Sequence, residues 1–333
     1  MLRILLFINI ILAGALLLSY LSPFVDPSAT GFFAFFGLGY PFLLIINVLI
    51  CLFWIVFKPK YAILSVVAII LGFSPLKRTF GMAKSSPSTK GFTVMTYNIG
   101  KANYDLHREK GRQKKIDRFN RFVSTSAPNI ICLQERRAIY ADHYKQIFAN
   151  YNLVSSSKTG TAIYTQFPVV NSGMLAFDTK FHNGTWADLK IGKDTCRIYS
   201  LHLSSNKVPN LTDNVKEIWD ESKYILDKYN HHAKLRVKQL DRVLAHAEDS
   251  PYPVVINGDF NDVPLSYLYQ KISDSYQDAF LEAGSGLAQT YRSRFIGLRI
   301  DYTFTNPHIK ILNHEILDSP ISDHLPVVTT MTL

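Results

Sequence analysis

The sequence predicts an α+β protein, a sandwich of two packed β-sheets with helices outside, preceded by about three transmembrane helices. Two observations support this prediction. Up to about residue 76 the 333-residue chain is almost free of charge, and beyond it charged and apolar residues alternate as in a soluble domain. The second part then contains many short strand patterns in mixed order with few helical ones.

Three apolar runs predict the transmembrane helices, at about residues 4–21, 31–57 and 61–76. A helix needs roughly 20 apolar residues to span a bilayer, so the third run is short for a span. A cleaved signal peptide explains the first run less well, because only Arg3 precedes it and a second apolar run follows at once. We therefore expect a membrane anchor over 1–78, a Ser/Pro-rich linker over 79–90 and a soluble domain over 91–333.

The positive charges predict the orientation of this integral membrane protein. Arg3, Lys58 and Lys60 place the N-terminus and the second loop inside, so three spans would carry the soluble domain outside. Lys77 and Arg78, directly after the third run, favour the opposite orientation. The expectation is an outward-facing domain.

Charge and cysteine content limit the kinds of site. The chain has 36 Lys+Arg and 26 Asp+Glu, of which residues 1–84 hold six basic and one acidic, so the remainder has 36−6 = 30 and 26−1 = 25, a net +5. This mild charge fits an anionic substrate without requiring one. The three cysteines lie in apolar segments, which indicates free thiols rather than a disulfide framework or a zinc site.

Strand and helix patterns follow in order along the soluble domain. Helical spacing of apolar residues predicts helices near 116–123 and 235–247, and two strands separated by Gly192-Lys193-Asp194 predict a hairpin. The expected strands are 92–99, 129–133, 161–164, 169–175, 186–191, 196–203, 253–256, 302–305, 309–312 and 327–332.

Polar residues interrupt or end six of these apolar segments, and all of them are Asn, Asp, Glu or His. Burying a charged carboxylate is costly unless it is paired or holds a metal, so six such interruptions point to a site. Each alone has a structural alternative: Asn98 could cap a strand, Glu135 could form a surface ion pair, and His202 could be a satisfied core histidine. The interrupting residues are Asn98, Glu135, His202, Asp259, Asn261, Asp301, Asp323 and His324.

These residues also carry a family resemblance. The segments Thr96-Tyr-Asn98, Leu133-Gln-Glu135, Ser200-Leu-His202-Leu203, Gly258-Asp-Phe-Asn261, Arg299-Ile-Asp301-Tyr302 and Ser322-Asp-His324 stand in the order of the motifs of the endonuclease/exonuclease/phosphatase superfamily. The resemblance covers about residues 92–333 and implies a DNase I-like, four-layer α/β-sandwich of two mixed sheets flanked by helices. The hydrophobic N-terminus also resembles that of membrane-tethered bacterial members, which implies a bacterial inner or plasma membrane.

The resemblance implies a role for each residue. Glu135 would be the main ligand of a divalent metal, with Asn98 and Asp323 completing the site directly or through water. Oxygen ligands suit Mg²⁺, or Mn²⁺ and Ca²⁺. Asp259 would activate the attacking water, and Asn261 would hold the water or the phosphate. His324, paired with Asp301, and His202 would contact the phosphoryl group from opposite sides.

The implied function is a membrane-anchored, metal-dependent phosphodiesterase. Nucleic acid is the leading substrate, cut as by an endonuclease or exonuclease; a lipid or inositol-phosphate headgroup is the alternative, and a non-catalytic membrane scaffold is a further one. The expected partners are this phosphoester substrate and the lipid bilayer, and no protein partner is inferred. Gly100 departs from those relatives that have an acid at this position, which favours one metal over two.

Overall fold

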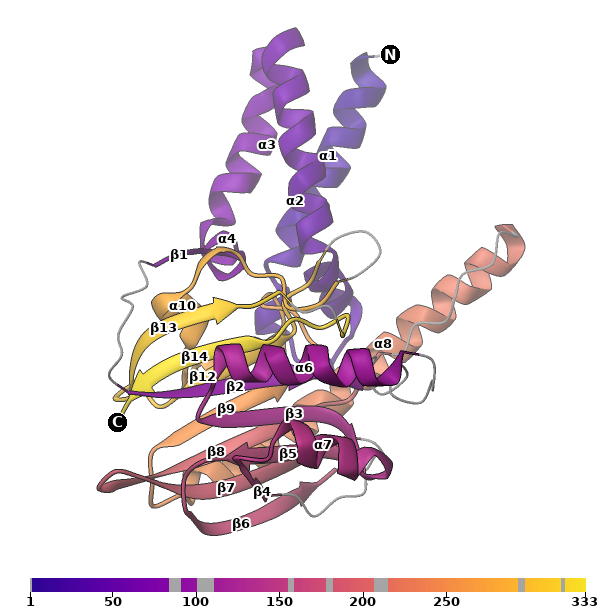
Figure 1. Ribbon diagram of the computed structural model, residues 1–333. Coiled ribbons are helices and arrows are strands. Elements are labelled where there is room, and N and C mark those ends of the chain that lie inside the picture. Colours follow the sequence, from indigo (N-terminus) through magenta and orange to yellow (C-terminus); the bar gives the residue numbers. More distant parts are fainter. Residues whose placement is uncertain are drawn as a thin grey trace. The chain divides into compact units, whose positions relative to one another are not determined.

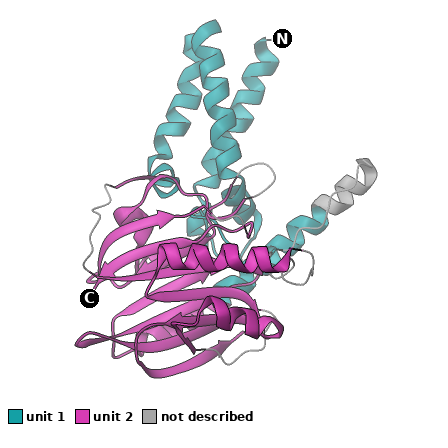
Figure 2. Ribbon diagram, in the orientation of Figure 1, with its two compact units in different colours: residues 1–80, 205–238, 262–271 teal, residues 81–204, 239–261, 272–333 magenta. Residues whose placement is uncertain are grey.

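The computed structural model describes residues 2–83, 91–100, 111–154, 159–177, 182–206, 215–292, 297–318 and 321–333. Figure 1 shows N-terminal helices, labelled α1 to α3, and a β-rich part. The chain forms two compact units (Figure 2): unit 1 comprises Met1–Phe80, Ser205–Lys238 and Asp262–Lys271, and unit 2 comprises Gly81–Ser204, Gln239–Asn261 and Ile272–Leu333.

Unit 2 contains two six-stranded mixed sheets, as the sequence predicts. The first sheet has the order β13-β14-β2-β3-β5-β4. Its strands β2 and β3 are parallel neighbours, and the other pairs are antiparallel. The bounds are β2 Phe92–Asn98, β3 Ile130–Arg137, β4 Asn152–Val154, β5 Thr159–Thr165, β13 Lys310–Ile316 and β14 Val327–Thr332.

The second sheet has the order β10-β12-β9-β8-β7-β6, with β8 and β9 parallel. The predicted hairpin is confirmed, since β7 and β8 pair in antiparallel register across Gly192. The bounds are β6 Val169–Ala176, β7 Asn183–Ile191, β8 Asp194–His202, β9 Val254–Asp259, β10 Gln277–Asp278 and β12 Asp301–Thr305; β1 Phe80–Met82 and β11 Ser285–Leu287 form a separate ribbon.

Period-two alternation decides what each strand presents to the space between the sheets. In β2, Met95 and Tyr97 pack in a cluster with Phe119 and Val123 of α6 (Arg112–Ser126). The alternate residues Phe92 and Val94 instead pack in a cluster that contains residues of both sheets. Other helices of this unit are η2 Ala138–Tyr140, α7 Ala141–Ile147 and α10 Ala279–Ala283.

The interior between the sheets changes from apolar to polar along the strands. Its apolar part includes Ile130 and Cys132 of β3 and Ile198 of β8. Further along the same strands, Gln134 is fully buried, and its amide nitrogen donates to Ser200 Oγ of the opposite sheet at 3.2 Å. This polar layer lies next to the strand ends that carry the candidate site residues.

Unit 1 contains the N-terminal helices α1 Leu2–Ser19, α2 Phe32–Phe57, α3 Pro59–Leu71 and α4 Phe73–Thr79, with a short 3-10 turn, η1 Ser22–Phe24. Two helices, α1 with its 3-10 extension and α2, are long and apolar enough to cross a membrane. The pair α3 and α4 is bent by 60° and gives a third span only if both count as one. The expected 79–90 linker begins in α4 and β1, and its residues 84–90 lie outside the described residues.

Buried polar groups join the three long N-terminal helices. Ser65 of α3 donates to Asn9 Oδ1 of α1 at 2.7 Å, and Asn47 of α2 donates to the carbonyl of Leu12 at 3.1 Å. Hydrogen bonds of this kind favour one packing of membrane helices over others. Unit 1 also includes the first part of α8 Val215–Glu248 and most of α9 Tyr267–Ser273.

Candidate active site

Three neighbouring strands place a row of site residues across the second sheet. His202 ends β8, Asp259 ends β9 and Asp301 begins β12. The strand register pairs His202 with Asp259 and Asp259 with Asp301. The sequence separations of 57 and 42 residues therefore become adjacent positions on one sheet edge.

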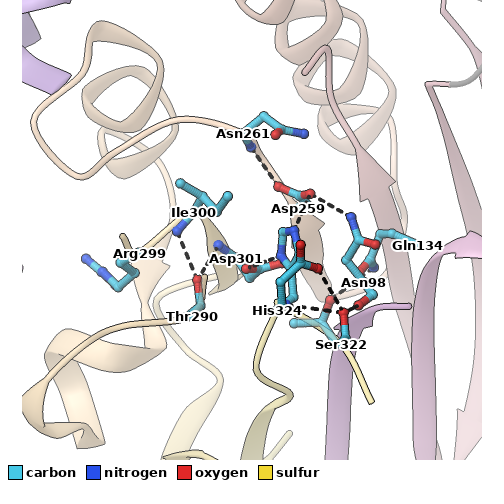
Figure 3. Close-up of polar contacts among 12 residues, drawn as sticks. Asn98, Gln134, Asp259, Asn261, Thr290, Arg299, Ile300, Asp301, Ser322 and His324 are labelled. Carbon is cyan, nitrogen blue, oxygen red and sulfur yellow. Dashed lines mark hydrogen bonds and ion pairs between the residues drawn. The ribbon is translucent and has the colours of Figure 1, made fainter. Parts of the chain in front are cut away.

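Asp259 is buried and receives contacts from both sheets (Figure 3). Its Oδ2 accepts a hydrogen bond of 2.9 Å from the amide nitrogen of Asn98, at the end of β2. Its Oδ1 accepts one of 2.9 Å from the backbone N–H of Asn261. Burial, and then the charge of Asp301, raises the pKa of Asp259 to about 6, while His324, His202 and Asn98 act in the opposite direction.

His324 and Asp301 form the expected pair. The Nδ1 atom of His324 lies 3.0 Å from Asp301 Oδ2, and its Nε2 lies 3.8 Å from Asp259 Oδ2. Burial lowers the pKa of His324, but the carboxylates of Asp301 and Asp259 outweigh it and raise the pKa to about 10. Both ring nitrogens of the resulting imidazolium are donors, and Nε2 is the one nearer the carboxylate of Asp259.

Glu135 is the accessible carboxylate of the site, with its side chain 44% exposed. It follows the polar layer in β3, where the pairing with β5 is interrupted between Leu133 and Arg136. Its φ of 57° lies in the left-handed region, which is uncommon for residues other than glycine and turns its side chain out of the regular alternation. Asn98 donates to Glu135 Oε1 at 3.1 Å and so links it to Asp259.

Gly100 leaves the space that Glu135 fills. A Cβ at position 100 would lie 2.3 Å from Glu135 Oε2 and 2.6 Å from its Cδ. A side chain at position 100 would therefore meet the carboxylate of Glu135, and glycine leaves that carboxylate in place.

Among the residues that the structure describes, neither ring nitrogen of His202 has a hydrogen-bond partner, although the residue is only 4% exposed. Its Nε2 lies 3.8 Å from both Glu135 Oε1 and Asp259 Oδ2. A buried imidazole without a hydrogen bond is costly, which disfavours the satisfied core histidine of the sequence alternatives. The Nε2 atom is thus equidistant from the two carboxylates.

Asp323 and Asn261 complete the set of predicted residues. Ser322 donates to the carbonyl of Asn98 at 2.8 Å and accepts from the N–H of His324, which holds the Ser322-Asp-His324 segment against the end of β2. Asp323 is half-buried in this segment. Asn261 has a φ of 52°, and its side chain donates to the carbonyl of Leu203 at 3.0 Å.

Several supporting residues were not predicted. Thr290 Oγ1 accepts a hydrogen bond from the N–H of Asp301 at 3.0 Å. The ring of Tyr291 packs 4.8 Å from that of His324. The ring of His182 lies 4.9 Å from that of His202. Asn183, the first residue of β7, pairs with His202 in the register, and its Oδ1 accepts from the N–H of Thr161. The rule of polar residues at strand ends could have found Asn183, but the predicted strand began three residues later. Thr290 and Tyr291 are not at the end of any predicted strand, so this rule could not have found them.

The two packed sheets with acid, amide and imidazole groups at their shared edge define a DNase I-like fold. Residues 95–324 match the model of the endonuclease/exonuclease/phosphatase family. The chain belongs to this family, whose members are phosphoesterases that generally use divalent metal ions. Residues 2–79 match a domain of unknown function, and no curated protein matches the chain.

Solved structures of the same fold include proteins from bacteria and animals. An endonuclease/exonuclease/phosphatase from Bacteroides vulgatus is 17% identical, with a TM-score of 0.57 over 74% of this chain and 100% of that one. A Bacteroides thetaiotaomicron mannosyl-6-phosphatase is 16% identical, with 0.54 over 73% and 100%. D. rerio TDP2, complexed with a single-strand DNA product, is 15% identical, with 0.55 over 73% and 100%. At these identities the likeness shows the fold alone.

Proposed function

We propose that this chain is a membrane-anchored, divalent-metal-dependent phosphodiesterase in which water attacks the phosphorus in line. The observation that supports it best is the convergence on Asp259 of Asn98 from one sheet and of His202 and His324 around it. A buried carboxylate with a pKa raised to about 6 is suited to take a proton from water near neutral pH.

The residues fit a hard divalent cation. Glu135 offers a half-exposed carboxylate, and His202 Nε2, which has no hydrogen-bond partner among the described residues, lies 3.8 Å from it. We assign Glu135 as the main ligand of Mg²⁺, or of Mn²⁺ or Ca²⁺, with Asp323 completing the site. Asn98 Oδ1 accepts from the N–H of Gly100 and its nitrogen faces the carboxylates, so its contribution would be to orient them or to act through water.

Asp259, Asp301 and His324 could also hold a cation by distance alone, since one ligand atom of each lies within 4.8 Å of the others. The raised pKa of His324 favours the imidazolium, which cannot ligate a metal. We therefore assign this trio to the phosphoryl group and the attacking water.

Each residue then has one task. A bound cation would neutralise phosphate oxygens and charge on the leaving oxygen. Asp259 would take the proton of the water, and Asn261, whose backbone holds Asp259, would position the water or the phosphate. His324, oriented by Asp301, would donate to a phosphoryl oxygen, and His202 would do so from the other side of Asp259.

Nucleic acid is the leading substrate by similarity, supported by the DNA product in the D. rerio TDP2 structure. The mannosyl-6-phosphatase supports a small phosphate ester, and the apolar helices favour a lipid headgroup. The scaffold alternative is disfavoured because every expected catalytic position is filled. Attack of water on the phosphorus is common to all three substrates, whereas only the nucleic acid and a lipid phosphodiester have a second ester bond on the phosphate.

Replacing Glu135 with glutamine tests the reaction. Glu135→Gln keeps the size and removes the charge, so we expect the Mg²⁺ concentration for half-maximal activity to rise sharply while the protein stays folded. The measurement is hydrolysis of bis(p-nitrophenyl) phosphate by the full chain in detergent, with circular dichroism as the folding control. Wild-type hydrolysis that persists unchanged in EDTA would exclude the metal mechanism.

A further inference from the structure

The end of β3 that carries Glu135 lies beyond the regular pairing of its sheet. The register between β3 and β5 is interrupted between Leu133 and Arg136, so Glu135 has no register partner in β5. On the other side, the pairing of β2 with β3 ends where Asn98 meets Gln134, one residue earlier. Glu135 also has a left-handed backbone conformation. The two neighbouring strands therefore do not by themselves fix the position of this carboxylate.

A hydroxyl of the opposite sheet binds this end of β3. Ser200 of β8 is fully buried, and its Oγ donates to the carbonyl of Leu133 at 3.2 Å. The same Oγ accepts from the amide nitrogen of Gln134, also at 3.2 Å. One side chain of the second sheet thus makes hydrogen bonds to both residues that directly precede Glu135.

The place of Ser200 along β8 connects this contact to the candidate active site. His202 follows two residues later, and residues two apart in a strand share a face. The Nε2 atom of His202 lies 3.8 Å from Glu135 Oε1, across the space between the sheets. The same short segment of β8 therefore carries both the hydroxyl that holds β3 and the imidazole that faces Glu135.

The side chain of Gln134 extends the contact to a third strand. It is fully buried, and its amide nitrogen also donates to Thr96 Oγ1 of β2 at 3.0 Å. Its Oε1 has no hydrogen-bond partner among the residues that the structure describes. The orientation of Gln134 thus depends on the contacts of its nitrogen, and Ser200 provides a contact from the second sheet.

We propose that Ser200 is a positioning residue for the metal ligand, because its hydroxyl holds the end of β3 and so keeps the carboxylate of Glu135 beside His202. The inference depends on the proposed function, in which Glu135 binds the cation. Ser200 acts through the backbone and the amide of β3 rather than on the substrate. Residues that support a ligand in this way typically contribute about 10- to 100-fold to metal affinity.

Equilibrium binding of Mn²⁺ to the full chain in detergent tests the inference without a substrate. The measurement is the loss of the electron paramagnetic resonance signal of free Mn²⁺. Ser200→Ala removes only the hydroxyl, so we expect the dissociation constant for Mn²⁺ to rise about 10-fold. In hydrolysis of bis(p-nitrophenyl) phosphate, the half-saturating Mn²⁺ concentration should rise by the same factor. At saturating Mn²⁺, kcat and the KM for the diester should stay close to the wild-type values.

Thr305→Val is the matched control. Thr305 is also fully buried, and its Oγ1 accepts from Gln277 Nε2 at 2.9 Å, but both residues belong to the second sheet. Thr305 pairs with Val255, near the start of β9, whereas Asp259 is at the end of β9. This variant loses a buried hydrogen bond without releasing β3. It should therefore lower the thermal midpoint and leave the affinity for Mn²⁺ unchanged.

A pair of variants of equal size separates the hydroxyl from the packing at position 200. Ser200→Thr keeps a hydroxyl, and Ser200→Val has a methyl group in its place. Both add the same bulk to a strand that accepts β-branched residues. We expect Ser200→Thr to bind Mn²⁺ more tightly than Ser200→Val. Equal affinities would contradict a role of the hydroxyl.

The remaining outcomes distinguish the inference from the proposed function. Wild-type affinity for Mn²⁺ in Ser200→Ala, in an assay where Glu135→Gln weakens binding, overturns the inference alone. An equal loss of affinity in Thr305→Val also overturns it, because the effect would then follow general destabilisation. If Glu135→Gln binds Mn²⁺ as tightly as the wild type, the proposed function itself loses its metal ligand.

Discussion

Asp259 is the residue on which the contacts of the candidate site converge. Asn98 and the backbone of Asn261 hold its two oxygens, and His202 and His324 lie 3.8 Å from one of them. An amide at this position would keep the size and lose the ability to take a proton. A substitution at this residue therefore best separates proton transfer from metal binding.

Asp259→Asn should lower kcat by about 10²–10⁴, the usual cost of losing a general base. Metal affinity should stay close to that of the wild type, because Glu135 is unchanged. Asp301→Asn should act more weakly, through a less basic and less well oriented His324. The measurement is kcat and Mg²⁺ dependence for both variants; Asp259→Asn retaining more than about a tenth of wild-type kcat would show that another group is the base.

Gly100 gives a prediction about space rather than charge. A methyl group there would displace the carboxylate of Glu135, so Gly100→Ala should weaken Mg²⁺ binding about 10- to 100-fold, as for other residues that support a ligand. Excess Mg²⁺ should restore activity. Gly39→Ala is the control, since the nearest atom to its added Cβ is 4.0 Å away. An unchanged Mg²⁺ titration for Gly100→Ala would refute the crowding argument.

At the scale of elements, β13 and β14 contain a buried imidazole that makes the fold sensitive to acid. His314 is opposite Thr329 in the register, and its Nδ1 lies 3.0 Å from Thr329 Oγ1. Burial lowers the pKa of His314 from 6.5 to about 4, with Arg299 adding to the effect and Asp278 opposing it. The unfolded chain therefore takes up the proton first as the pH falls.

Stability should consequently decrease between about pH 6.5 and pH 4. Protonation of His314 should lower the free energy of unfolding by about 3 kcal/mol at most, since one unit of pKa shift corresponds to 1.36 kcal/mol. His314→Gln should flatten this dependence, measured as the thermal midpoint of the detergent-solubilised chain across the pH range. His308→Gln, at an exposed histidine, should leave the slope as it is. An equally steep slope without His314 would assign the acid sensitivity to other groups.

The strands also show what the sequence could predict about the site and what it could not. Strand ends and motif order identified Asn98, Asp259 and Asp301 because polar residues at the ends of buried strands are visible in one dimension. Which of them become neighbours depends on register, and the register of β8, β9 and β12 is set by pairings between distant segments. The left-handed backbone of Glu135 has no local sequence signal, since the interruption of β3 is set by its pairing with β5.

At the scale of the whole molecule, sidedness is still a prediction from the charges. Arg3, Lys58 and Lys60 place the N-terminus inside and the catalytic part outside. Protease added to intact cells or spheroplasts should then cleave the catalytic part. Complete protection until lysis would reverse the orientation. A cytoplasmic marker protein that stays uncleaved is the control for intact membranes.

The apolar helices were predictable as helices but not as neighbours of Leu265. Their composition identifies the two spans directly. Leu265, by contrast, lies in a segment that the sequence assigns to the soluble domain. A single leucine in that segment does not indicate which residues it packs against. Only the folded chain shows it in a cluster with Ala13 and Tyr40.

This cluster also limits how the gene could evolve. A catalytic domain joined to its anchor by a linker alone can have that anchor replaced by gene fusion, without any other change in the domain. Here the N-terminal helices share one compact unit with segments far along the chain, at Asp262–Lys271 and in the first part of α8. The two segments should therefore be inherited together, and recombination that replaced residues 2–79 would have to replace the matching leucine and its neighbours as well.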